Sequence, residues 1–255
     1  MTKLPFLDTE GRVVPPPRRR LLKEMGAVLR PRRPIKRVPA LAGAPRGDGH
    51  PVLVLPGFLT TDGRTRRLRR FLKGLGYAVY GWERGINLGP TNRMLAAIES
   101  RLISIHARHG HKVTLIGHSL GGVLARELAK KFPDHVRQLV MLGSPAHLPT
   151  ATSLAVFFRL LAPLHRTALG WNIDDVNRPP PDEVPVTAIH TREDGIVAWQ
   201  TCLEAPGPLR ENIEVRGDHS TLPSNTEVLL VIADRLAQPE GEWRPHGRAP
   251  RRRFL

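Results

Sequence analysis

Six short strand-like runs alternate with amphipathic segments along most of the chain, and this alternation restricts the fold more than any other feature of the sequence. The runs cover residues 52–55, 77–80, 113–117, 136–143, 184–190 and 212–217. Short apolar runs are typical of strands buried on both faces of a parallel sheet, whose strands must be joined by crossover helices. The sequence therefore predicts an α/β fold with a reduced, mainly parallel, six-stranded sheet and helices on both faces.

The segments between these runs have the 3.6-residue periodicity of helices. In residues 64–75 apolar side chains recur on one face, and six Lys or Arg side chains cover the rest. The other predicted helices of this region cover residues 92–109, 120–131 and 225–237. The predicted α/β domain as a whole spans residues 51–238.

A longer insertion, residues 146–183, interrupts the alternation. Its first part carries a wide apolar stripe that includes Phe157, Leu160 and Leu161. Such a stripe fits a core helix, and it fits equally a small lid that lines an apolar substrate pocket. The lid interpretation assigns these three side chains to the pocket.

The N-terminal 50 residues form a proline- and arginine-rich arm before the domain. The prolines at 15–17, 31, 34, 39 and 45 exclude a long helix there, so residues 18–30 are the only part of the arm expected to be helical. Leu21, Leu22, Met25 and Leu29 share one side of that helix. The arm is expected either to wrap on the domain or to bind a surface.

The net charge of +16 is concentrated at the two ends of the chain. Residues 1–46 hold 12 Lys or Arg against three acids, and residues 244–255 hold five Arg and no acid. The basic tail, residues 239–255, thus mirrors the N-terminal arm. Both ends are read as solvated chain or as a contact with an anionic membrane surface. Specific nucleic-acid binding is not expected, because no recognition motif accompanies the charge.

A single cysteine, Cys202, excludes an internal disulfide and fits a reducing compartment. No signal-like or membrane-spanning apolar run is recognised, so a cytoplasmic protein is expected, with peripheral contact at the inner face of the membrane as an option. No metal-binding or nucleotide-binding motif is present, and no metal or cofactor is expected.

Residues 117–121 carry the chemistry of the chain. Gly117, His118, Ser119, Leu120 and Gly121 fit the pattern G-x-S-x-G between an apolar strand and an amphipathic helix. In that context the serine occupies a sharp strand-to-helix turn that needs the two glycines, and its hydroxyl stands above the sheet. The alternative is an ordinary turn with a serine helix cap.

The GHSLGG sequence resembles the nucleophile elbow of lipases and esterases of the α/β-hydrolase superfamily, and the resemblance covers residues 51–237. A sheet that begins at the third strand of that fold accounts for the six strands. The segment 52–58, VLVLPGF, is similar to the oxyanion loop of the family. The resemblance implies that the backbone N–H groups of Phe58 and Leu120 form the oxyanion hole.

Ser119 needs a general base, and eleven histidines are available. Only His219 lies after the last strand and before the last helix, where the fold places the base; His118 is expected to face away. Asp194, in a D-G-x-V run after the penultimate strand, resembles the acid of the family and is preferred over Glu193. The order Ser119, Asp194, His219 is the order of this fold.

The sequence therefore predicts a carboxylic ester hydrolase that acts through an acyl-enzyme, with a small or lipid-like ester as substrate. The same triad also supports acyl transfer, thioester cleavage or amide cleavage. Cofactor-free peroxidase-type or carbon–carbon hydrolase chemistry occurs on this fold as well. A membrane-associated binding protein without catalysis is the alternative from another class.

Overall fold

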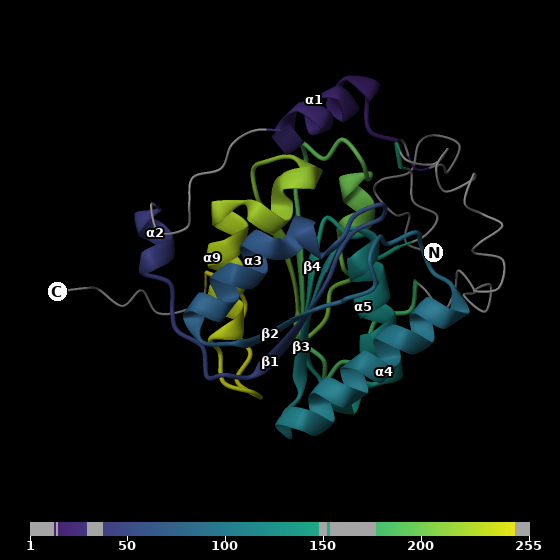
Figure 1. The fold of residues 1–255 in the computed structure, drawn as a ribbon. Coiled ribbons are helices and arrows are strands. Elements are labelled where there is room, and N and C mark those ends of the chain that lie inside the picture. The colour runs from purple at the N-terminus through teal and green to yellow at the C-terminus, as the bar shows by residue number, and fades with distance from the viewer. Residues whose placement is uncertain (1–12, 14, 30–37, 148–151, 154–176, 248–255) are drawn as a thin grey trace.

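One parallel sheet organises the molecule (Figure 1). The structure is a computed structural model that describes residues 13, 15–29, 38–147, 152–153 and 177–247. The sheet has the order β2-β1-β3-β4-β5-β6, and every pair of neighbours is parallel. The strands are β1 Pro51–Leu55, β2 Ala78–Gly81, β3 Val113–His118, β4 Val136–Leu142, β5 Val186–His190 and β6 Arg210–Glu214. The predicted fold class is confirmed.

Helices cover both faces of the sheet (Figure 1). The two on one face are α3 Asp62–Leu75 and α9 Thr226–Leu236, and the two on the other are α4 Asn92–His109 and α5 Leu120–Lys131. Alternation along β1 separates the two cores, since Val52 and Val54 pack toward α3 and α9 while Leu53 and Leu55 pack toward α4 and α5. Burial on both faces explains the continuous apolar character of this strand.

The described part of the N-terminal arm contains the helices α1 Arg18–Leu29 and α2 Pro39–Ala42. The expectation that only residues 18–30 of the arm are helical was wrong, because Pro39 occupies the first position of α2, where its missing N–H removes no helical bond. The predicted apolar side of α1 is only partly used, since Leu21 packs against buried side chains of residues 196–202 while Leu22 is 71% exposed.

The last strand begins and ends earlier than expected, at Arg210–Glu214 instead of 212–217. It pairs with β5 alone at the edge of the sheet, so its side chains are half-buried or exposed and give a weak apolar signal. Most of the predicted insertion, with Phe157, Leu160 and Leu161, lies outside the described residues. Across the described part of the chain, the helices are too short or too polar to cross a membrane.

Candidate active site

Ser119 lies in a sharp turn between β3 and α5, with φ 53° and ψ −124°. Such backbone angles cost a non-glycine residue about 1–3 kcal/mol. Two glycines make the turn possible, because a Cβ on Gly117 would lie 2.3 Å from the carbonyl oxygen of Gly121. A Cβ on Gly121 would lie 2.4 Å from the carbonyl oxygen of Leu55. The spacing of the glycines thus reflects the close approach of α5 to β1 and β3.

The carboxylate of Asp194 and the imidazole of His219 form a buried pair. Asp194 Oδ2 lies 2.6 Å from His219 Nδ1, and both side chains are almost inaccessible. The other oxygen of Asp194 accepts hydrogen bonds from the backbone N–H groups of Ile196 and Val197, at 2.8 and 2.7 Å. These bonds fix the carboxylate in place, so that it holds the imidazole by one nitrogen and leaves the other for chemistry.

The surroundings of His219 favour its protonated form. Burial of the imidazole disfavours the positive charge, but the Asp194 carboxylate outweighs this by charge and by hydrogen bonding. Glu24 adds to the same effect and Arg64 opposes it, and the result is a raised pKa of His219. A histidine in this state accepts a proton readily, as a general base must.

The end of β4 lies against both Ser119 and His219. The backbone N–H of Ser119 donates to the carbonyl of Leu142 at 2.9 Å. A Cβ on the next residue, Gly143, would lie 3.0 Å from Nδ1 of His219, and Gly143 has a φ of +56°. The carboxyl end of β4 therefore lies against the backbone of Ser119 and against the ring of His219, which is paired with Asp194.

His118 contacts His219, so the expectation that it faces away was wrong. Its ring lies 4.9 Å from the ring of His219, and its Nε2 is 3.0 Å from the His219 carbonyl oxygen. Burial lowers the pKa of His118 well below its ordinary value, so the ring is neutral and donates from Nε2. The residue before Ser119 thereby supports the backbone of His219.

The loop after β1 contains the predicted oxyanion donor Phe58, which is buried. The side-chain amide of Asn87 donates to the backbone carbonyl of Pro56 at 2.8 Å. The backbone carbonyl of Asn87 accepts from the backbone N–H of Leu59 at 2.7 Å. Asn87 is fully buried and supports this loop, a role that no sequence pattern indicated. Leu120 is the first residue of α5, so its N–H has no acceptor within the helix.

Glu24 is the other residue that the sequence analysis missed. It belongs to α1, is 2% exposed, and accepts hydrogen bonds from backbone N–H groups of Gly195, His219 and Ser220. Its only distinction in the sequence is that it is one of three acidic residues among the first 46. Within the described residues, no group of three or more His, Cys, Asp or Glu side chains could hold a metal ion.

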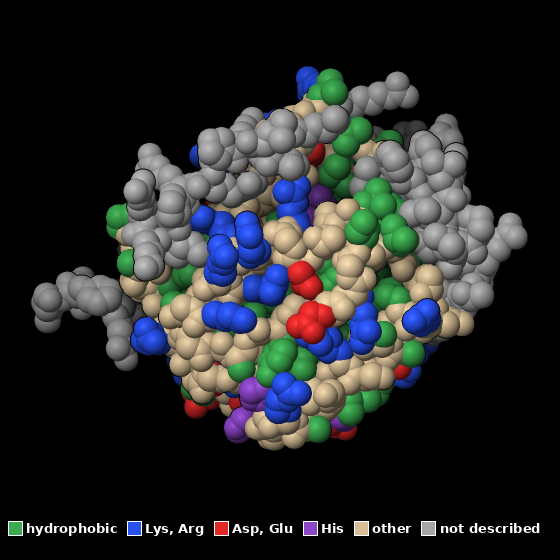
Figure 2. Space-filling view, in the orientation of Figure 1, with side chains coloured by type: hydrophobic (Ala, Val, Ile, Leu, Met, Phe, Trp, Pro, Cys, Tyr) green, Lys and Arg blue, Asp and Glu red, His purple; other side chains and the backbone are tan. Residues whose placement is uncertain are grey.

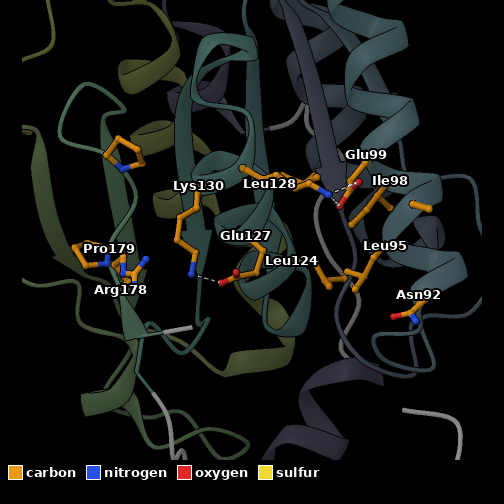
Figure 3. Close-up of a pocket in the computed structure, with 13 residues that line it drawn as sticks. Asn92, Leu95, Ile98, Glu99, Leu124, Glu127, Leu128, Lys130, Arg178 and Pro179 are labelled. Carbon is orange, nitrogen blue, oxygen red and sulfur yellow. Dashed lines mark hydrogen bonds and ion pairs between the residues drawn. The ribbon is translucent and has the colours of Figure 1, made fainter. Parts of the chain in front are cut away.

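Two hollows accompany the site. A groove of about 480 Å³ begins beside the oxyanion loop, and its lining includes Leu59, Arg64, Ile86 and Ser224. A pocket of about 670 Å³ lies between α4, α5 and residues 178–181, lined by apolar side chains and by the Glu127–Lys130 and Glu99–Lys131 ion pairs (Figure 3). None of the three predicted catalytic side chains lines either hollow, but the lining of the groove includes Leu59 and Thr60, which directly follow the predicted oxyanion donor Phe58.

Comparisons with known proteins agree with this arrangement. A family model for the α/β hydrolase fold matches residues 91–169. No curated protein matches the sequence significantly. The lipase BlEst2 of Bacillus licheniformis is similar in structure, with a TM-score of 0.57 and 14% identity over 77% of this chain and 95% of its own.

Two further solved structures are similar. A metagenome-derived lipolytic enzyme of the LipS and LipT pair has a TM-score of 0.57 at 15% identity, over 74% of this chain and 94% of its own. The monoacylglycerol lipase of Paleococcus ferrophilus has a TM-score of 0.54 at 20% identity, over 76% of this chain and 96% of its own. At sequence identities this low, the structural similarity establishes the fold but does not indicate the substrate.

The sheet order, the strained serine turn and these matches define a protein of the α/β-hydrolase fold.

Proposed function

We propose that the protein is a serine ester hydrolase in which Ser119 is the nucleophile, His219 the general base and Asp194 the acid that orients it. The observation that carries the proposal is the buried 2.6 Å bond between Asp194 and His219, together with a serine at the carboxyl end of β3 whose backbone is held at φ 53°. A strained residue persists only where its surroundings enforce it, and such residues cluster at active sites. The same arrangement supplies the base that a serine hydroxyl needs at neutral pH.

In the proposed reaction, Nε2 of His219 takes the proton of the Ser119 hydroxyl as its oxygen attacks the ester carbonyl. The N–H groups of Phe58 and Leu120 donate to the oxyanion of the tetrahedral intermediate. The C–O bond to the alcohol then breaks, and the alcohol leaves with the proton from His219. Water repeats the sequence on the acyl-enzyme, and the carboxylic acid is released as the serine regains its proton.

The groove beside the oxyanion loop supports an acyl-chain or other lipid-like ester. Two large apolar side chains that line it are exposed, Leu59 by 41% and Ile86 by 55%. Backbone hydrogen bonds between residues 59–60 and Asn87 hold the two loops together. Exposed apolar groups at a mouth of this kind suit a substrate with a long apolar portion.

A panel of p-nitrophenyl esters from acetate to palmitate tests this function. We expect kcat/KM to rise with acyl length beyond acetate, because each buried methylene contributes about 0.8 kcal/mol. The double variant Leu59→Ser and Ile86→Ser should lose this preference while it keeps its rate on acetate. Absence of hydrolysis across the panel, with folded protein, would exclude the proposed activity; added alcohols that divert the acyl group would indicate transfer in place of hydrolysis.

We propose further that the protein acts at an anionic lipid surface from the cytoplasmic side. Lys and Arg side chains gather over α3 (Figure 2), and further arginines stand at the C-terminus. Each such charge near an acidic membrane contributes about 1 kcal/mol. Replacement of the four arginines in 248–255 by Gln should weaken co-sedimentation with phosphatidylglycerol vesicles at least tenfold. Binding that ignores both salt and these substitutions would contradict the proposal.

A further inference from the structure

Glu24 is a buried carboxylate that none of the steps above uses. Its Oε1 accepts from the backbone N–H of His219 at 2.7 Å and from that of Gly195 at 3.1 Å, and its Oε2 accepts from that of Ser220 at 2.8 Å. All three donors therefore belong to the two loops that carry the proposed acid and base. A carboxylate this deeply buried is tolerated only when donors satisfy it, and here they are all backbone groups.

The rest of α1 follows the same two loops. Arg20 donates from Nη1 to the carbonyl of Arg192 at 2.6 Å, and the ammonium of Lys23 lies 2.5 Å from Glu193 and 3.3 Å from Asp218. Leu21 packs against the apolar side chains that follow Asp194. The helix thus contacts residues 192–197, which we call the acid loop, and residues 218–220, which we call the base loop.

The glycine that follows Asp194 leaves the space that α1 occupies. A Cβ on Gly195 would lie 2.6 Å from the carbonyl oxygen of Arg20 and 2.8 Å from Cγ of Glu24. A larger residue at position 195 would push α1 outward and pull the Glu24 carboxylate from its three donors. Only a glycine at position 195 therefore allows α1 to pack against the acid loop in the observed position.

We propose that Glu24 is a positioning residue of the active site, which ties the acid loop to the base loop so that His219 stays aligned between Asp194 and Ser119. One oxygen, Oε1, receives N–H bonds from both loops, so a shift of either loop breaks a bond to the same atom. The activity readout of this inference rests on the proposed function. The N-terminal helix is then part of the catalytic apparatus as well as a contact with the domain.

The charge of Glu24 has a second consequence for the base. The groups that face the imidazole of His219 are the carboxylates of Asp194 and Glu24, the guanidinium of Arg64, and the neutral ring of His118. Both carboxylates raise the pKa of His219. Removal of the charge on Glu24 should lower that pKa, and the acid limb of the activity profile should move to lower pH.

The variant Glu24→Gln tests the inference in the full-length chain. The carboxamide keeps one acceptor oxygen, but its NH₂ group faces a backbone donor. We expect kcat on a p-nitrophenyl ester to fall about 10- to 100-fold, as for the loss of a buried hydrogen bond to a charged group. KM should change little, and the acid limb of kcat/KM should move to lower pH. The low-field proton signal of the His219–Asp194 bond should weaken.

The matched control is Leu22→Gln on the exposed side of the same helix, which should behave as the wild type. The inference would be overturned if Glu24→Gln had the wild-type kcat, the wild-type acid limb of kcat/KM and the wild-type proton signal. It would also be overturned if a lower melting temperature were the only change in this variant. If that variant does not fold, Gly195→Ala, which displaces α1 by crowding, must give the same pattern or the inference is wrong. If the wild type hydrolyses no ester, the proposed function fails, while the proton signal still decides the role of Glu24.

Discussion

Replacement of Ser119 by Ala should lower the turnover of a p-nitrophenyl ester by about 10⁴- to 10⁶-fold, because the residual rate of such variants comes from binding and the oxyanion hole alone. The expectation follows from the position of the serine at φ 53° in the turn between β3 and α5. The measurement is kcat under saturating substrate, with the alcohol product followed by absorbance.

The neighbouring Ser144 supplies a matched control. It is also buried, and its hydroxyl donates to the backbone carbonyls of Gly117 and Leu142 at the same end of the sheet. Ser144→Ala should retain turnover within about tenfold, since it loses one neutral hydrogen bond of about 1 kcal/mol. An enzyme that keeps its full rate without the hydroxyl of Ser119 would rule that residue out as the nucleophile.

The second large effect is expected for Asp194→Asn. This change removes the charge that outweighs the burial of His219 and reverses the hydrogen-bonding role of the group opposite Nδ1. An Asn at this position in a related triad mechanism selects the wrong tautomer of the base and costs about 10⁴ in kcat. A comparable loss of kcat is expected here at neutral pH.

The pH dependence of kcat/KM provides a second test of the role of Asp194. The neutral form of His219 is the active base, so kcat/KM of the wild type falls as the pH drops through the raised pKa of His219. Asn at position 194 withdraws the charge that raises this pKa, and the acid limb should move to lower pH. The control is Glu193→Gln, on the adjacent exposed residue. A variant Asp194→Asn with an unchanged acid limb would exclude Asp194 as the partner of the base.

Chain order and local pattern are sufficient for much of this site. The strand–turn–helix context around Ser119 depends on neighbours in sequence, and the positions of His219 and Asp194 depend on which strand each follows. Both kinds of information can be read from nearby residues. Since parallel strands have their carboxyl ends at one edge of the sheet, a residue that follows a strand is expected at that edge. The six strands and the five long helices were predicted for the same reason.

Long-range supports of the site were not predicted. Glu24 precedes His219 by 195 positions, and its donors are backbone groups, which leave no mark on the side chains of their own loops. Asn87 likewise acts on the carbonyl of Pro56. The prediction for His118 was wrong because the sequence pattern of a strand indicates only the face to which a side chain points. It does not indicate that the loop of His219 packs against that face. The predicted pocket residues of the insertion stay predictions.

Labelling with a fluorophosphonate, which reacts with serines activated by a base, tests whether Ser119 is the nucleophile. The folded wild-type chain is treated with this reagent, and the modified peptide is identified by mass spectrometry. We predict one adduct, on the hydroxyl of Ser119, which is lost in His219→Ala although that variant remains folded. A folded wild-type chain that stays unmodified, or carries its adduct on another residue, would exclude Ser119 as the activated nucleophile and favour a binding protein with an inactive triad.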